Sequence, residues 1–108
     1  MKIIETQFFR QQLHQLSAKY PKIFEDYEDF QTSFNPHFST NLWDSVFKER
    51  CKNSSIPTGK RWWFRIIIKV FGDIAVPLLI YSKTIQENIT AEELNHALSS
   101  VIKELSFK

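Results

Sequence analysis

The fold is decided by residues 62–81, which read WWFRIIIKVFGDIAVPLLIY. Two runs of β-branched and aromatic residues flank Gly72-Asp73, a pair of turn formers, so we expect strands at Trp62–Phe71 and Ile74–Tyr81. Pro77 has no backbone N–H and therefore predicts a bulge or an edge position. Side chains alternate between the two faces of a strand. The predicted core face carries Trp62, Phe64, Ile66, Ile68 and Val70, and the other carries Trp63, Arg65, Ile67 and Lys69.

The residues around this hairpin predict the remaining elements. Apolar residues recur at helical spacing in two segments on either side of Pro21, and a Thr-x-x-Glu capping box at Thr90 begins a third helix. The outer face of the second helix is expected to be negative, with Glu25, Asp26, Glu28 and Asp29. The C-terminal helix has an apolar side made of Leu94, Leu98, Val101, Ile102 and Leu105. The predicted segments are a strand at Lys2–Glu5, helices at Gln7–Tyr20 and Ile23–Phe34, a strand at Leu42–Lys52 and a loop at Asn53–Gly59.

Together these elements predict a single α+β domain over residues 1–108. Its expected order is β-α-α-β-β-β-α, an antiparallel β-sheet with an N-terminal helical hairpin and a C-terminal helix. A chain of 108 residues that is 43% hydrophobic can bury one core. The lone Cys51 cannot form an intramolecular disulfide, which fits a reducing, cytoplasmic location. We expect neither a secretory signal nor a membrane-spanning segment.

Charge is distributed unevenly along the chain. The formal net charge is +2, but residues 48–69 hold seven basic residues and one acidic residue, a local charge of +6. A phosphate backbone responds to the local surface potential rather than to the sum over the chain. A polyanion is therefore the leading candidate partner.

The basic residues of this window have the spacing of a strand face. Lys48, Arg50 and Lys52 stand at i, i+2 and i+4, so they share a face, and Arg65 and Lys69 join them if the two strands pair. Such a face could hold RNA phosphates and stabilise the charge that develops on phosphorus during cleavage. A solvated strand face is an equally good interpretation.

Aromatic residues accompany these cations. Trp63 is a candidate for stacking on an unpaired base, whereas alternation favours a core position for Trp62. Tyr81 could present a phenol at the strand end, or it could pack under a loop. His14 and His96 fall on predicted helices and His37 in a loop, away from the basic strands, so none is favoured as an acid or base. Histidine spacing offers no support for a metal site.

Four motifs resemble those of the RelE/HigB-like toxins of bacterial toxin–antitoxin systems. They are Lys48-Glu49-Arg50-Cys51-Lys52, Gly59-Lys60-Arg61, Phe64-Arg65-Ile66-Ile67 and Leu79-Ile80-Tyr81-Ser82-Lys83. Their order along the chain matches that family. The chain departs from many relatives in having Trp62-Trp63 instead of two glycines, and in lacking an arginine and a tyrosine after the last strand.

The resemblance implies a ribosome-dependent mRNA endoribonuclease. Such enzymes cut mRNA in the ribosomal A site by attack of the RNA 2′-hydroxyl, use no metal or other cofactor, and are inhibited by a cognate antitoxin protein. It implies catalytic roles for Lys48, Arg50, Arg65 and Tyr81, with Lys48 a candidate base because neighbouring cations favour its neutral amine. The expected RNA-binding residues are Lys52, Lys60, Arg61, Trp63, Lys69 and Lys83. Two alternatives are a ParE-like inhibitor of DNA gyrase and an inactive member that retains only antitoxin binding.

Overall fold

The computed structural model describes residues 2–35, 40–43, 45–56, 63–82 and 90–106. Within these ranges the chain combines helices with one β-sheet, which confirms the predicted α+β class. The elements are β1 (Lys2–Ile3), α1 (Gln7–Ser17), α2 (Ile23–Ser33), β2 (Thr40–Trp43), β3 (Val46–Cys51), β4 (Phe64–Phe71), β5 (Ile74–Ser82) and α3 (Ala91–Ser106).

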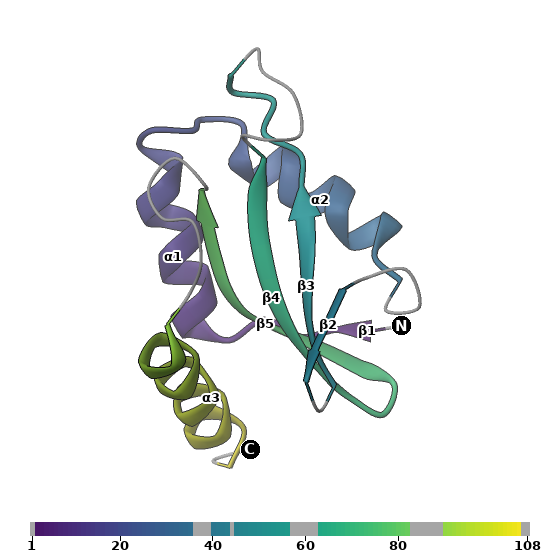
Figure 1. The fold of residues 1–108 in the computed structure, drawn as a ribbon. Coiled ribbons are helices and arrows are strands. Elements are labelled where there is room, and N and C mark those ends of the chain that lie inside the picture. Colours follow the sequence, from purple (N-terminus) through teal and green to yellow (C-terminus); the bar gives the residue numbers. More distant parts are fainter. Residues whose placement is uncertain (1, 36–39, 44, 57–62, 83–89, 107–108) are drawn as a thin grey trace.

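The sheet has five strands in the order β1-β5-β4-β3-β2 (Figure 1). Each neighbouring pair from β2 to β5 is antiparallel, but β1 runs parallel to β5. The sheet is therefore mixed, and the prediction of an antiparallel sheet is wrong at this edge. The reason is that α1 and α2 intervene between β1 and the rest of the sheet, so β1 does not have to reverse direction as it would in a hairpin.

The predicted hairpin of β4 and β5 is present. It turns at Gly72, whose φ of 58° is readily adopted without a Cβ atom. Ile67 pairs with Leu79 and Ile68 pairs with Pro77, so Leu78 is an extra residue in β5. This bulge, predicted from Pro77, lies beside α1. There the side-chain amide of Gln12 donates to the Leu78 carbonyl at 3.0 Å and accepts from the Ile80 N–H at 3.1 Å.

The predicted strand Leu42–Lys52 is wrong in its extent, because it is two strands. β2 and β3 are separated at Ser45, whose φ of 63° lies in the left-handed region and reverses the chain. Thr40 pairs with Lys48 and Trp43 with Val46. Along the described part of the chain the order of elements is therefore β-α-α-β-β-β-β-α, which has one strand more than the predicted order. Lys52 follows the end of β3 instead of belonging to it.

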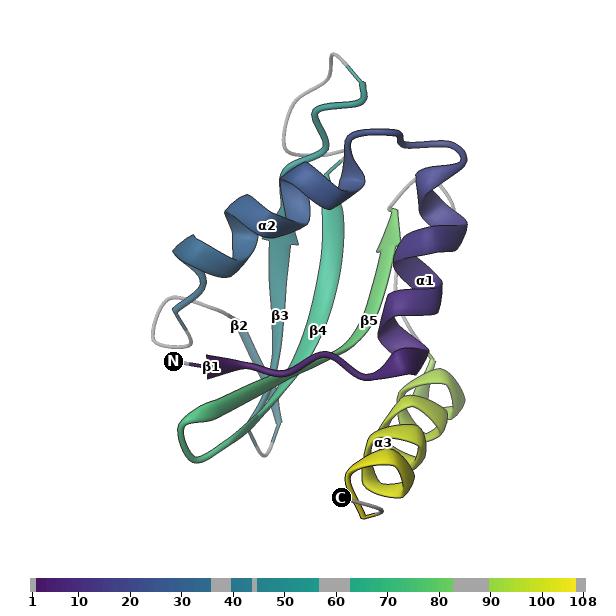
Figure 2. The same cartoon turned by 180° about the vertical axis from the view of Figure 1, so that it is seen from behind.

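Helices cover both faces of the sheet. Figure 2 shows α1 beside β5 and α2 crossing β3 and β4. Their buried aromatic and aliphatic side chains meet the core face predicted for β4, including Phe64, Ile66 and Ile68. The ring of Tyr20 lies edge-on to Phe64 at 5.1 Å between centroids. On the opposite face, α3 buries Leu94, Ala97 and Val101 against β4 and β5.

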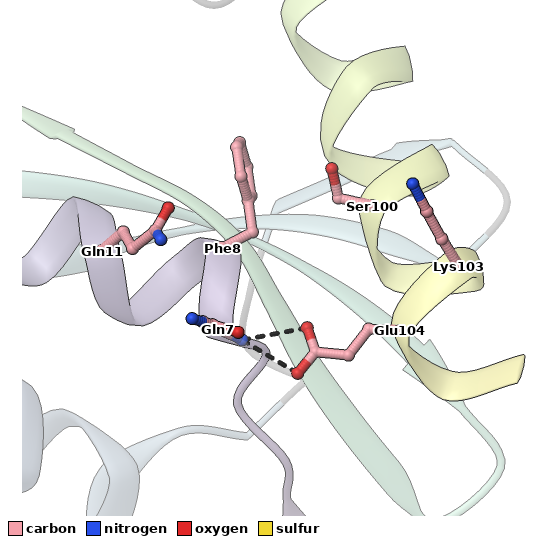
Figure 3. Close-up of a pocket in the computed structure, with 6 residues that line it drawn as sticks. All are labelled: Gln7, Phe8, Gln11, Ser100, Lys103 and Glu104. Atoms are coloured by element: carbon pink, nitrogen blue, oxygen red, sulfur yellow. Dashed lines mark hydrogen bonds between the residues drawn. The ribbon is translucent and has the colours of Figure 1, made fainter. Parts of the chain in front are cut away.

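A capping box at one end and hydrogen bonds to α1 near the other hold α3 in place. The predicted capping box is confirmed: Thr90 Oγ1 accepts from the Glu93 N–H, and the Glu93 carboxylate accepts from the Thr90 N–H, both at 3.1 Å. Near its other end, both carboxylate oxygens of Glu104 accept from the Gln7 N–H at the start of α1, at 3.0 and 2.9 Å (Figure 3). A shallow cleft of about 400 Å3 lies between the two helices at this contact.

Two expectations about helix faces are wrong. Ile102, predicted on the apolar side of α3, is 62% exposed, and the side chain of Leu105 lies outside the described residues. Asp26, predicted on the acidic outer face of α2, is buried because its carboxylate accepts from the backbone N–H and the hydroxyl of Ser54. Glu25, Glu28 and Asp29 are exposed, so the outer face of α2 is still acidic.

Candidate nucleic-acid interface

The pairing of β3 with β4 places four predicted site residues on one face of the sheet. Arg50 pairs with Arg65, and Arg65 pairs in turn with Tyr81 of β5, so these three form one row across the strands. Lys48 pairs with Ile67 in the next row on the same face. Opposite residues in an antiparallel pair have Cβ atoms about 4.5–5.5 Å apart. The register therefore brings Lys48, Arg50, Arg65 and Tyr81 together.

Arg65 lies at the centre of this row and is buried. Only 5% of its surface is exposed, and its Nη1 donates to the Trp63 carbonyl at 2.8 Å. Burial lowers the pKa of Arg65, and the neighbouring charge of Arg50 acts in the same direction. The alternative interpretation, a solvated strand face, is therefore wrong at Arg65. Arg65 is a fixed positive charge beneath the surface, whereas Arg50 beside it is exposed.

Tyr81 closes the row on β5 and lies in the apolar cluster beneath α3. Of the two interpretations of Tyr81, a phenol presented at the strand end is wrong, since Tyr81 is buried together with Leu94 and Val101 of α3. Burial raises the pKa of Tyr81, opposed by Arg65 and reinforced by the carboxylate of Glu93. No described residue forms a hydrogen bond with the Tyr81 hydroxyl.

Ile67 shows that α3 covers part of this face of the sheet. The prediction placed Ile67 on the same face as the cations, and it is fully buried there in the cluster with α3. Figure 1 shows α3 beside β5, and no described helix lies in front of β3. The accessible part of the face is therefore its β3 side, which carries Lys48 and Arg50.

The other predicted RNA-binding residues are spread more widely. Lys52 is exposed just after β3, and Trp63 is half-buried just before β4. Lys69 pairs with Val46 at the far end of β4, where its Nζ lies 5.6 Å from the centroid of the Phe71 ring. Four residues of the interpretation lie outside the described part of the chain: Lys60, Arg61, Trp62 and Lys83.

The described histidines lie away from the row. His14 on α1 and His96 on α3 are exposed, as predicted, and each makes an edge contact with an aromatic ring, Phe24 and Phe8 respectively. His37 lies outside the described residues. Among the described residues, no group of three or more His, Cys, Asp or Glu side chains could hold a metal ion.

The sequence interpretation assigned no role at the site to two acidic residues that lie near it, Glu93 and Asp29. Glu93 contributes its charge at Tyr81, and Asp29 contributes its charge at the buried thiol of Cys51. The capping box located Glu93 along the chain, but no local pattern indicated that α3 would return over Tyr81.

Comparisons of the sequence with known proteins assign no family to this chain. The sequence matches no protein-family model. It also matches no curated protein. None of the described helices combines the length and the apolar character needed to cross a membrane.

Proposed function

We propose that this protein is a RelE/HigB-like toxin that binds mRNA on the ribosome and cleaves it without a metal. The observation that carries the proposal is the row Arg50-Arg65-Tyr81 with Lys48 beside it on the same face. The predicted RelE-like arrangement, in which a Lys-x-Arg strand lies next to an aromatic-Arg-Ile-Ile strand, is compatible with this register. The cytoplasmic location and the antitoxin partner belong to the same proposal.

The burial of Arg65 and Tyr81 divides the proposed roles. Arg50 is exposed and is suited to contact the scissile phosphate, whereas Arg65 adds a preorganised positive charge behind it. In the proposed step the RNA 2′-oxygen attacks phosphorus while the bond to the 5′-oxygen breaks. The attacking hydroxyl gives its proton to Lys48, which must be a neutral amine beforehand, and the leaving oxygen takes a proton from water. Tyr81 positions Arg65 from beneath α3.

The test compares the parent protein with Arg50→Gln by primer extension on a reporter mRNA in a reconstituted translation reaction. Arg10→Gln is the matched control, because Arg10 is exposed on α1 outside the row, and a glutamine amide can still donate a hydrogen bond to the Glu5 carboxylate that Arg10 contacts at 2.7 Å. Cuts in codon register are expected with the parent and the control. Loss of one charge-assisted phosphate contact is expected to slow cleavage by Arg50→Gln about tenfold or more.

Intact mRNA with the parent protein would refute the nuclease. Inhibition of gyrase-dependent supercoiling by the same protein would then indicate a ParE-like toxin. Equal cleavage by the parent and Arg50→Gln would leave a nuclease but remove Arg50 from its site.

A further inference from the structure

A second hollow lies beside the proposed site, between α2 and the end of β3. Its volume is about 240 Å3, which is below the range of about 300–1,000 Å3 for pockets that take drug-sized ligands. Arg50 lines it from β3 and Lys52 from just after β3, while Asp26 and Asp29 line it from α2 and Trp63 from the chain before β4. A hollow of this size suits a single heterocyclic ring system.

The residues around this hollow combine the groups that recognise an unpaired base. Trp63 offers an indole ring, and aromatic side chains are the usual platform for unstacked bases. Arg50 and Lys52 are exposed cations, so they can hold a phosphate or a base oxygen at the opening. Arg50 belongs to both places, because it also pairs with Arg65 in the row described above. An RNA strand whose phosphate lies on Arg50 would therefore have a neighbouring base within reach of the hollow.

The two carboxylates in the hollow differ in what they can still bind. Asp26 is buried and accepts two hydrogen bonds from Ser54, one to each carboxylate oxygen. Asp29 is exposed. Its negative charge acts on the Cys51 thiol, which also lines the hollow and whose pKa is raised mainly by burial and further by Asp26 and Asp29. Asp29 is therefore the carboxylate that faces the hollow and can accept hydrogen bonds from a ligand.

An ionised carboxylate accepts two hydrogen bonds and donates none. Its preferred base must present two adjacent N–H donors. Guanine does so at N1 and N2, while cytosine and adenine place an acceptor beside their amino group and uracil has a single N–H between two carbonyls. Guanine also offers O6 and N7 to Arg or Lys, the commonest specific contact of those side chains.

We propose that this hollow is a guanine-binding subsite, in which Asp29 accepts from N1–H and N2–H while Trp63 stacks on the base. The proposal rests on the proposed function, because it places the guanine next to the nucleotide whose phosphate lies on Arg50. It gives the nuclease a base preference that the cationic face alone cannot supply, since phosphate contacts carry no sequence information.

The experiment titrates the purified full chain with each of the four nucleoside 5′-monophosphates and follows the indole N–H signals by NMR. Guanosine 5′-monophosphate is expected to bind about tenfold more tightly than the other three, as one bidentate pair allows. Asp29→Asn should lose this preference and gain adenosine binding, because an amide pairs with the N6 and N7 edge of adenine. Glu28→Gln is the matched control, since Glu28 is exposed on the same helix and does not line the hollow.

Equal affinity for the four nucleotides would overturn the guanine subsite, and so would an equal change in both variants, which would indicate only the loss of a negative charge. The titration needs neither a ribosome nor cleavage, so the two proposals fail separately. A preference for guanosine 5′-monophosphate with intact mRNA would refute the proposed nuclease activity. Cleavage of mRNA without that preference would refute the guanine subsite.

Discussion

Replacing Tyr81 by phenylalanine is expected to stabilise the protein. The Tyr81 hydroxyl is buried and has no hydrogen-bond partner among the described residues, while its ring lies in the cluster with Leu94 and Val101. A buried polar group without a partner costs about 1–3 kcal/mol, and phenylalanine removes the hydroxyl while keeping the ring. We expect the free energy of unfolding to rise by about 1–2 kcal/mol, at the lower end of that cost.

Tyr20→Phe provides the matched control. Tyr20 is also buried, but its hydroxyl donates to Ser82 Oγ at 3.1 Å. Loss of that bond should lower the free energy of unfolding by about 1 kcal/mol. The same chemical change is thus expected to have opposite signs at the two positions, a difference of about 2–3 kcal/mol.

Urea unfolding followed by circular dichroism measures both variants, with the slope of unfolding free energy against urea expected to stay constant. A Tyr81→Phe protein as destabilised as Tyr20→Phe would refute the reasoning, because the hydroxyl must then have a partner. The stabilised variant also sharpens the cleavage assay. If Tyr81→Phe is more stable and yet inactive, its loss of cleavage cannot come from unfolding, which is the result expected if the hydroxyl positions Arg65.

Two further predictions concern the fold around the site. Burial raises the pKa of Cys51 from 9.0 to about 12. The stabilising contribution of the neutral thiol is therefore complete below pH 9 and is lost as pH rises toward 12, at about 1.4 kcal/mol per pH unit. Cys51→Ala should remove this contribution, so the free energy of unfolding of the variant should fall less steeply with pH above 9 than that of the parent. Urea midpoints between pH 8.5 and 10 measure this, and parallel curves for parent and variant would contradict it. Gln12→Ala should cost about 2 kcal/mol, because it removes both hydrogen bonds to β5, whereas Gln15→Ala, exposed on the same helix, should change stability by less than about 0.5 kcal/mol. Thermal unfolding of the pair checks this, and equal melting temperatures would show that the amide of Gln12 is dispensable.

Local sequence signals predicted the elements whose cause is local. The alternation in Phe64–Phe71, the turn at Gly72, the bulge near Pro77 and the capping box of Thr90 and Glu93 are each determined by residues within a few positions. Ser45 is the local failure. Its left-handed conformation splits the predicted strand, and serine has no strong preference for that region of backbone space, so the residue type alone did not indicate the turn.

Long-range contacts account for the errors at the site. Strand register brought Lys48, Arg50 and Arg65 together as their spacing indicated, and it added Tyr81 to their row. However, α3 covers Tyr81 and Ile67, and it lies farther along the chain than both. One signal was available in the sequence. Ile66-Ile67-Ile68 is a continuous apolar run, which is typical of a strand buried on both faces rather than on one.

The contact between Gln12 and β5 has a consequence for how copies of this protein meet one another. Open backbone groups along an outer strand are a template on which another chain can add its own strand and begin to aggregate. On the outer side of β5 and the residue before it, the carbonyls of Asp73 and Ala75 accept hydrogen bonds from the N–H groups of Lys2 and Ile4, in and just after β1. Pro77 has no N–H group, and the Gln12 amide binds the Leu78 carbonyl and the Ile80 N–H. The two-residue strand β1 and the side chain of Gln12 thus together occupy the open backbone groups of β5. This side of the sheet therefore resists the addition of a strand from another molecule.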